Sequence, residues 1–301
     1  MLRPGPLLTP IVLVMLLVEV LLASSARSVE PQAGAQSTKS KTLRVAALLP
    51  WVADAVEAAG ADVQLVAGVR RQLHEALPAG LIDLGNPHSP SLERLAESDP
   101  DLVVADRAIH ARLAPQIEKL GARVLLLGTD SVAETLASLT TLSNALGQPK
   151  TLDARIVAVH ARIGELAGHS EGSVVALFGA PGSFFVMTER AWLGDLARHL
   201  GLELAIEEAG EERFPGLVAV SDEAMAMAHP DLVLLVAHGD PRRIQADLER
   251  RTATDGAWSG LADARLGIHV LDPGLFSANP GLEIVRAAEA LVALASAAPK
   301  S

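Results

Sequence analysis

The stretch Ser91-Leu92-Glu93, followed by Pro100-Asp101-Leu102-Val103, occurs a second time as Ser221-Asp222-Glu223 followed by Pro230-Asp231-Leu232-Val233. In both copies the proline follows the glutamate by seven positions (93 to 100 and 223 to 230). Each copy is typical of a serine-capped helix of about two turns, a Pro-Asp stop and a buried strand. Any two β-α-β units look broadly alike, but an identical tetrapeptide at an identical offset favours two related halves.

Short apolar runs alternate with amphipathic segments from Leu43 to the C-terminus. The apolar runs, each bounded by Gly, Pro or Asp, predict buried strands at 43–49, 63–66, 81–84, 102–105, 124–127, 174–178, 202–206, 232–236 and 268–271. The amphipathic segments predict helices at 52–59, 109–120, 189–200, 241–251 and 280–296. Alternation of strand and helix implies parallel sheets with helices on both faces. The expected fold class is therefore α/β, with two Rossmann-like lobes.

A long stretch without a strand signal separates the two halves. Between Thr151 and Gly168, apolar residues recur at the spacing of one helix face, at Ile156, Val159, Ile163 and Leu166. A helix of this length spans about 25 Å and would join two lobes as a stiff connector. The expected division is an N-terminal α/β lobe over 42–148, a connecting helix over 149–169 and a C-terminal α/β lobe over 170–301.

The N-terminus has the pattern of a secretory signal. Arg3 precedes an apolar run from Ile11 to Leu22, interrupted only by Glu19, and small residues follow up to Ala26. A membrane-spanning helix needs about 20 apolar residues, and the charge of Glu19 opposes one. We therefore expect a signal peptide over 1–26, a flexible leader over 27–41 and a periplasmic location. An uncleaved membrane anchor is the alternative.

Composition excludes several kinds of site. The formal net charge of -11 disfavours a nucleic-acid partner, because phosphate contacts need clustered Lys and Arg. The chain has no cysteine, so it has no disulfide, no thiolate metal site and no cysteine nucleophile. It has no tyrosine either, which excludes a phenolate ligand for iron or haem.

Four stretches resemble the periplasmic substrate-binding proteins of ABC importers for iron-siderophores, haem or cobalamin. They are 43–50, 89–95 with 100–104, 179–184 with 192–196, and 271–276 with 280–281. The resemblance covers nearly the whole chain after the N-terminal signal. It implies two α/β lobes joined by one long rigid helix, with the ligand held in the cleft between them. It also implies a monomer whose partners are a small metal-containing ligand and a permease in the inner membrane.

In that family one glutamate at the tip of each lobe docks onto arginines of the permease, and Glu93 and Glu223 match those positions. A carboxylate in the first turn of a helix is compatible with the helix dipole and is free to meet a cation. The simpler alternative is that each glutamate only stabilises its own helix.

Ligands of open α/β sheets bind beyond the carboxyl ends of the strands. The expected loops there, or the residues beside them, hold three aromatic candidates for a flat or apolar ligand surface, which are Trp51, Phe184 and Phe276. Two arginines, Arg107 and Arg190, are candidates for pairing with carboxylates of a chelate or of haem.

Three of the nine histidines, His88, His110 and His238, also follow predicted strands. Imidazole is a common ligand of transition metals, so these three could bind a free zinc, manganese or iron ion directly. The alternative for each one is a hydrogen bond within its loop.

The segment Gly179-Ala180-Pro181-Gly182-Ser183 lacks the Lys-Ser/Thr of a phosphate-binding loop, and the chain has no Gly-x-Ser-x-Gly motif. The favoured function is therefore that of a binding protein, not an enzyme, with no intrinsic cofactor and a metal complex as its ligand. Three alternatives remain, namely a binder of free metal ions, an enzyme that uses a histidine and an aspartate in the same cleft, and an anchored surface sensor.

Overall fold

The computed structural model of the chain describes residues 41–70, 77–206, 212–253 and 256–298. The predicted signal peptide, 1–26, lies outside these residues, as does the predicted leader 27–41 except for its last residue. Across the described ranges, no helix is both long and apolar enough to cross a membrane.

The first lobe contains a five-stranded sheet in which every pair of neighbours is parallel, in the order β3-β2-β1-β6-β7. Its strands are β1 (Leu43–Ala47), β2 (Val63–Gly68), β3 (Ile82–Asp83), β6 (Leu102–Asp106) and β7 (Arg123–Leu127). A small hairpin, β4 (Gly85–Asn86) with β5 (Ser89–Pro90), follows β3. The helices are α2 (Val52–Ala59), α3 (Leu92–Glu97), α4 (Arg107–His110), α5 (Ala114–Glu118) and α6 (Val132–Ala145). The single helix predicted at 109–120 is therefore two short ones, and α6 was not predicted.

The second lobe has a mixed sheet in the order β11-β12-β9-β8-β13-β14, with β10 paired to the start of β8. Its strands are β8 (Ser173–Ala180), β9 (Ser183–Met187), β10 (Glu203–Leu204), β11 (Glu212–Phe214), β12 (Leu217–Val218), β13 (Leu232–Ala237) and β14 (Gly267–Val270). The expected parallel pairing holds for β10, β8, β13 and β14, whereas β8 also turns back as an antiparallel hairpin with β9. The helices are α8 (Trp192–His199), α9 (Asp222–Met227), α10 (Pro241–Thr252), α11 (Pro273–Phe276) and α12 (Ile284–Ala295).

The repeated Pro-Asp-Leu-Val motif has the same structural role in both lobes. The carboxylate of Asp101 accepts a hydrogen bond from the backbone N–H of Arg44 at 3.0 Å, one residue before Val45 pairs with Leu102. The carboxylate of Asp231 accepts one from the backbone N–H of Ser173 at 2.9 Å, in the same register relative to its own strands. Each aspartate therefore caps the first strand of its lobe.

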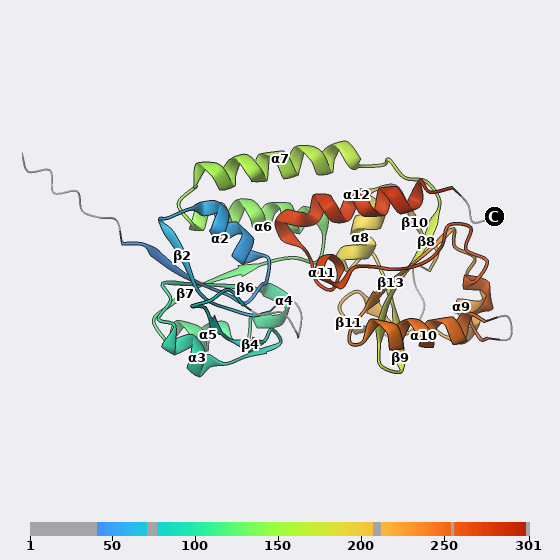
Figure 1. The fold of residues 1–301 in the computed structure, drawn as a ribbon, viewed down its shortest axis with the longest axis horizontal. Coiled ribbons are helices and arrows are strands. Elements are labelled where there is room, and N and C mark those ends of the chain that lie inside the picture. Colours follow the sequence, from blue (N-terminus) through green and yellow to red (C-terminus); the bar gives the residue numbers. More distant parts are fainter. Residues whose placement is uncertain (1–40, 71–76, 207–211, 254–255, 299–301) are drawn as a thin grey trace, which may run out of the picture. The chain divides into compact units, whose positions relative to one another are not determined.

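Helix α7 (Lys150–Leu166) connects the lobes and packs against α2 and α6 of the first lobe and α12 of the second (Figure 1). The buried residues of one face of α7 are those predicted from the spacing, together with Leu152. They belong to one continuous apolar core that also includes one face of each sheet. Two smaller cores cover the opposite faces of the sheets. Helices α3 and α5 flank the one on the first sheet, and α9 and α10 flank the one on the second.

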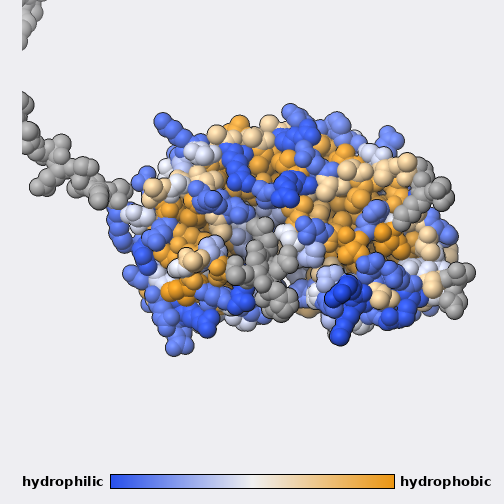
Figure 2. Space-filling view, viewed as in Figure 1, coloured by the Kyte–Doolittle hydropathy of each residue, from blue (hydrophilic) through white to orange (hydrophobic). Residues whose placement is uncertain are grey.

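Helix α10 shows how the outer layer is built. Ile244 and Leu248 are buried against the second sheet, whereas the rest of the helix is strongly polar. Figure 2 shows hydrophilic side chains gathered over α10, at the lower right of the view.

Buried hydrogen bonds also link the lobes. The Asn279 side-chain amide donates to the Thr129 carbonyl at 3.0 Å and to Thr135 Oγ1 at 2.7 Å, and its oxygen accepts from the Gly281 N–H at 2.9 Å. Thr129 and Thr135 belong to the first lobe, and Asn279 precedes the last helix of the second. Asn279 is only 8% exposed, so these bonds are largely protected from water.

Gly281 has a positive φ of 58° and contacts the ring of Trp51. A Cβ atom at this position would lie 2.3 Å from the ring. Only glycine therefore allows the second lobe to approach the first this closely.

We expect the two equivalent aspartates to control acid stability. The hydrogen bond from Lys41 and the Arg44 N–H lower the pKa of Asp101, and the hydrogen bonds from Ser173 N–H and Arg265 lower that of Asp231. Because the folded pKa values lie below the unfolded value of about 3.9, the stabilisation is complete above that pH and is lost as pH falls through the folded pKa values.

The double variant Asp101→Asn/Asp231→Asn should therefore melt at a lower temperature than wild type at neutral pH, and the difference should shrink below about pH 4. Circular dichroism melts over a pH series measure this. The exposed Asp263→Asn is the control and should leave the melting curves unchanged. A difference that stays constant down to about pH 2 would contradict the assignment.

Asn279→Ala should destabilise the protein by about 2–4 kcal/mol, because it removes three buried hydrogen bonds and leaves their partners unsatisfied. Denaturant unfolding gives the free energy. The exposed Asn144→Ala on α6 is the matched control, with an expected change within about 0.5 kcal/mol. Equal effects of the two substitutions would show that the bonds between the lobes contribute nothing.

Candidate ligand-binding site

The topology of each sheet locates a ligand-binding edge. In the first sheet the strand order reverses between β1 and β6, and in the second it reverses between β8 and β13. A crevice opens at such a switch point, beyond the carboxyl ends of the strands. The loops there are 50–51 and 106–107 in the first lobe, and 180–181 and 238–240 in the second.

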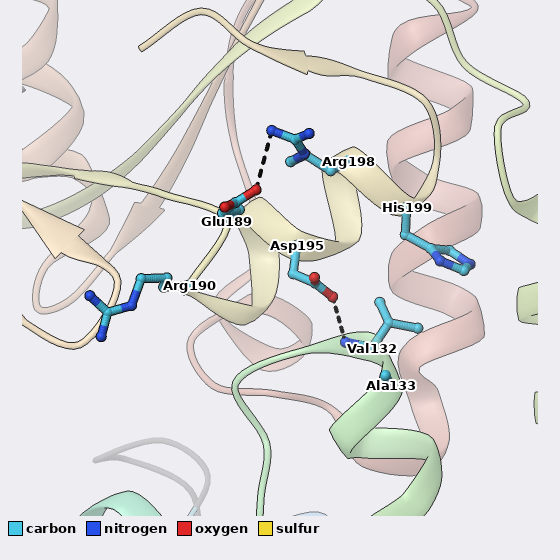
Figure 3. A pocket seen from close by; sticks show the side chains of 7 residues that line it. All are labelled: Val132, Ala133, Glu189, Arg190, Asp195, Arg198 and His199. Atoms are coloured by element: carbon cyan, nitrogen blue, oxygen red, sulfur yellow. Dashed lines mark hydrogen bonds and ion pairs between the residues drawn. The ribbon is translucent and has the colours of Figure 1, made fainter. Parts of the chain in front are cut away.

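A pocket of about 520 Å³ lies between the lobes. The N-terminus of α6 forms one side, and the loop before α8 together with α8 itself forms the other (Figure 3). We call it the interlobe pocket, and its lining residues are Val132, Ala133, Glu189, Arg190, Asp195, Arg198 and His199. Its volume is in the range of small-molecule sites, about 300–1,000 Å³.

Charged side chains dominate this pocket. Asp195 accepts a hydrogen bond from the backbone N–H of Val132 at 2.6 Å, which joins α8 to the start of α6. Glu189 pairs with Arg198 at 3.2 Å, and Arg190 extends away from that pair (Figure 3). Arg190 forms an ion pair with Glu212 at 2.7 Å, but its side chain is 67% exposed. An exposed pair of this kind is weak and can exchange for an anionic ligand.

Arg107 follows the switch-point strand of the first lobe and forms an ion pair with Glu134 of α6. Asp130 lies in the preceding loop. The pKa of the Asp130 carboxyl group is raised. The main cause is partial burial of that group, and the negative charges of Asp106 and Glu134 add to it. This edge of the first lobe is therefore acidic, with Arg107 as its cation.

The three aromatic candidates do not present open ring faces. Trp51 is 1% exposed and Phe276 is 3% exposed, and both belong to the core shared by the lobes. Phe276 stacks on Trp192. Phe184 packs edge-on against Trp258 with Arg251 over its ring, on the side of α10. Trp51 precedes α2 and Phe276 ends α11, and both rings pack into the core, whereas Phe184 lies half-buried in β9. Trp51 and Phe276 therefore do not form the predicted aromatic ligand surface.

The three candidate histidines are not brought together. Within the described parts of the chain, no group of three or more His, Asp or Glu side chains is placed to hold a metal ion. His110 is buried, and both of its ring nitrogens are within hydrogen-bond distance of backbone groups. His88 and His238 are exposed, on the first and second lobe respectively. The structure therefore does not support the predicted set of three metal ligands.

His238 differs from the other two because it is exposed and its ring also has a stacking partner. It stacks on Phe178 with a centroid distance of 5.5 Å and an interplanar angle of 28°. Its ring nitrogens have no hydrogen-bond partner among the residues that the structure describes. His238 is also the first residue after β13, at the switch point of the second lobe.

Glu93 and Glu223 occupy equivalent exposed positions. Each lies in the first turn of a short helix whose N-cap serine, Ser91 or Ser221, accepts a hydrogen bond at 3.2 Å from the N–H three residues on. Neither carboxylate has an ion-pair partner in the described ranges. Both are therefore available to a cationic surface.

Sequence reasoning missed most of the interlobe pocket. Of its lining residues, only Arg190 was predicted, and Glu189, Asp195, Arg198 and His199 were not. The antiparallel strand β9 causes this, since it brings the segment before α8 towards α6. The sequence feature that could have indicated this pocket is the group of charged residues at 189–190, 195 and 198 around the apolar pair Trp192 and Leu193.

The chain belongs to the periplasmic binding protein family, whose family model matches residues 39–256. The chain is therefore a binding protein and not an enzyme. One relative is the high-affinity heme uptake system protein IsdE of Staphylococcus aureus strain Newman. It is 24% identical over 254 residues, which are 82% of this chain and 83% of the relative.

Solved structures show the same two-lobed fold. An ABC transporter substrate-binding protein from Listeria monocytogenes EGD-e has a TM-score of 0.70 at 22% identity, and the match covers 85% of this chain and 99% of that one. S. aureus IsdE complexed with heme has a TM-score of 0.69 at 18% identity, with coverage of 85% and 99%. A periplasmic heme-binding protein from Pseudomonas aeruginosa has a TM-score of 0.65 at 22% identity, with coverage of 86% and 95%.

Proposed function

We propose that this protein is the exported substrate-binding component of an ABC importer, and that its cargo is haem. The proposal rests on two observations, which are the switch-point edges of the two lobes at Arg107 and His238 and a charged pocket lined by both lobes. Of the residues proposed below, Arg190 lines that pocket, whereas Arg107, His88 and His238 lie outside its lining. The names of IsdE and of the P. aeruginosa protein supply the ligand class, since both are described by the haem that they bind or take up.

His238 is the proposed ligand of the haem iron. Haem iron in proteins is commonly held by an imidazole, and without tyrosine the chain has no phenolate to offer. The stacking of His238 on Phe178 fixes the plane of its ring and leaves the ring nitrogens available. His88, exposed on the other lobe, is a candidate for the opposite face of the haem.

Arg190 and Arg107 are the proposed partners of the haem carboxylates. Arg190 lines the interlobe pocket and Arg107 follows the switch-point strand of the first lobe, and each side chain is more than half exposed. Their present partners, Glu134 and Glu212, hold the arginines in place when no ligand is bound. A carboxylate ligand would replace or share these contacts through bidentate hydrogen bonds.

Delivery is proposed to use Glu93 and Glu223. The carboxylates have the same place in two equivalent helices, so they suit a permease with two equivalent cationic sites. Closure of the lobes around the ligand is limited, because α7 and the Asn279 hydrogen bonds join them rigidly.

Titration of the ligand-free protein with haemin should give a shifted Soret band that saturates at one haem per protein. Ferric desferrioxamine and cyanocobalamin, added under the same conditions, should not bind. His238→Ala should weaken haemin binding by about tenfold or more and move the Soret maximum, because an iron ligand is lost.

The exposed His169, near the end of α7, provides the control variant His169→Ala, which should bind haemin like wild type. Binding of the siderophore or the corrinoid without haemin binding would transfer the proposal to another metal complex. Unchanged spectra in His238→Ala would remove His238 as the iron ligand.

The charge reversal Glu93→Lys/Glu223→Lys should leave haemin affinity unchanged and abolish the stimulation of ATP hydrolysis by the importer in proteoliposomes. The control is Glu118→Lys/Glu203→Lys, which changes one exposed acid on each lobe and alters net charge equally. Stimulation that persists in the first variant, or that is lost equally in the second, would refute a specific docking role.

A further inference from the structure

His110 is a buried, neutral imidazole with two defined hydrogen bonds. Its Nδ1 lies 3.0 Å from the backbone nitrogen of Asp106, and its Nε2 lies 2.6 Å from the Pro87 carbonyl oxygen. A backbone N–H can only donate, so Nδ1 is the acceptor. The proton is therefore on Nε2, which donates to Pro87. His110 is 1% exposed, and neither nitrogen is free for a metal.

The Pro87 carbonyl, which accepts the hydrogen bond from His110 Nε2, lies at the tip of the hairpin β4–β5. Its two strands have only two residues each, and a hairpin of that size is not stable by itself. At its base, Asp83 Oδ1 accepts from the Gly85 N–H at 2.9 Å. At its tip, the Pro87 carbonyl accepts the hydrogen bond from His110, which joins the hairpin to the rest of the lobe. The exposed His88 is the next residue.

The other partner of His110 is a rigid loop. Asp106 ends β6 at the switch point and is 4% exposed. Its carboxylate accepts hydrogen bonds from the N–H groups of Ala108 and Ile109 at 2.7 and 3.0 Å and from Thr129 Oγ1 at 2.7 Å. Arg107 projects from this loop. His110 thus connects this hairpin to a loop that three hydrogen bonds to the Asp106 carboxylate hold in place.

We propose that His110 is a positioning residue for ligand binding, which holds the hairpin tip and His88 in register with Arg107. The proposal rests on the proposed function, since it takes the cleft edge of the first lobe to be the ligand edge. In this role His110 does not contact the ligand. It acts by holding the residues that do.

Two substitutions separate the two hydrogen bonds. The amide oxygen of His110→Asn takes the place of Nδ1, so that the bond from Asp106 N–H is kept and the bond to the hairpin is lost. The longer His110→Gln places an amide nitrogen near the position of Nε2, so that the bond to Pro87 is kept and the other is lost. Both variants remove the ring, so both lose similar packing.

Hydrogen–deuterium exchange of the ligand-free protein measures how firmly the hydrogen bond from His110 to Pro87 holds the hairpin. His110→Asn should accelerate exchange in residues 84–90, and His110→Gln should leave it close to wild type. Thr129→Val is the control, because it removes a hydrogen bond from the same loop without touching the hairpin. Equal acceleration in both His110 variants would overturn the proposal.

Haemin affinity measures the consequence. His110→Asn should bind haemin about three- to thirty-fold more weakly than wild type, and His110→Gln should recover most of that loss. If wild type does not bind haemin, the proposed function fails, whereas the exchange result still decides whether His110 ties the hairpin. Equal affinities of the two variants would leave His110 as a packing residue only.

The tautomer can be read in the wild-type protein, which keeps the test open if the variants do not fold. Nitrogen-15 NMR of the His110 ring should show a protonated Nε2 and an unprotonated Nδ1 at neutral pH. A protonated Nδ1, or fast exchange between tautomers, would refute the hydrogen bonds on which the proposal stands.

Discussion

Continuous apolar packing through α7 is the constraint on which the rest of the molecule depends. One face of this helix contacts α2, α6 and α12, so the residues that stabilise the first lobe also stabilise the second. Neither lobe can rotate far without separating buried side chains from that face. The Asn279 hydrogen bonds and the contact of Gly281 with Trp51 add to this. This shared packing therefore limits how far the two lobes can move relative to each other.

Much of the architecture could be predicted because the decisive signals are local. The spacing of Ile156, Val159 and Ile163 determines the buried face of α7. The repeated Pro-Asp-Leu-Val indicated two related halves, and the structure explains the aspartate, because Asp101 and Asp231 each cap a neighbouring strand. The hairpin β8–β9 was not predicted, because the segment from Gly179 to Phe185 was interpreted as a loop after the strand. In the structure Phe185 pairs with Phe178 across the hairpin.

The site was harder to predict than the fold, because strand-end loops of the two lobes face either the ligand or each other. Trp51 and Phe276 follow strands as ligand contacts would, yet they fill the junction between the lobes. Only the tertiary structure separates these cases, since both place an aromatic ring after an apolar strand. The same holds for histidine, where His110 turned inward to backbone partners and His238 remained accessible on Phe178.

The position of α12 after both sheets has a consequence for folding. Leu282, Ile284 and Leu291 complete the core that α7 and both sheets share, and they follow both sheets in the sequence. The earlier helices α2 and α6 bury part of the apolar face of α7, but the part that α12 covers stays exposed until α12 is in place. A chain truncated before α12 would therefore leave part of the shared core open to water and would be prone to aggregate.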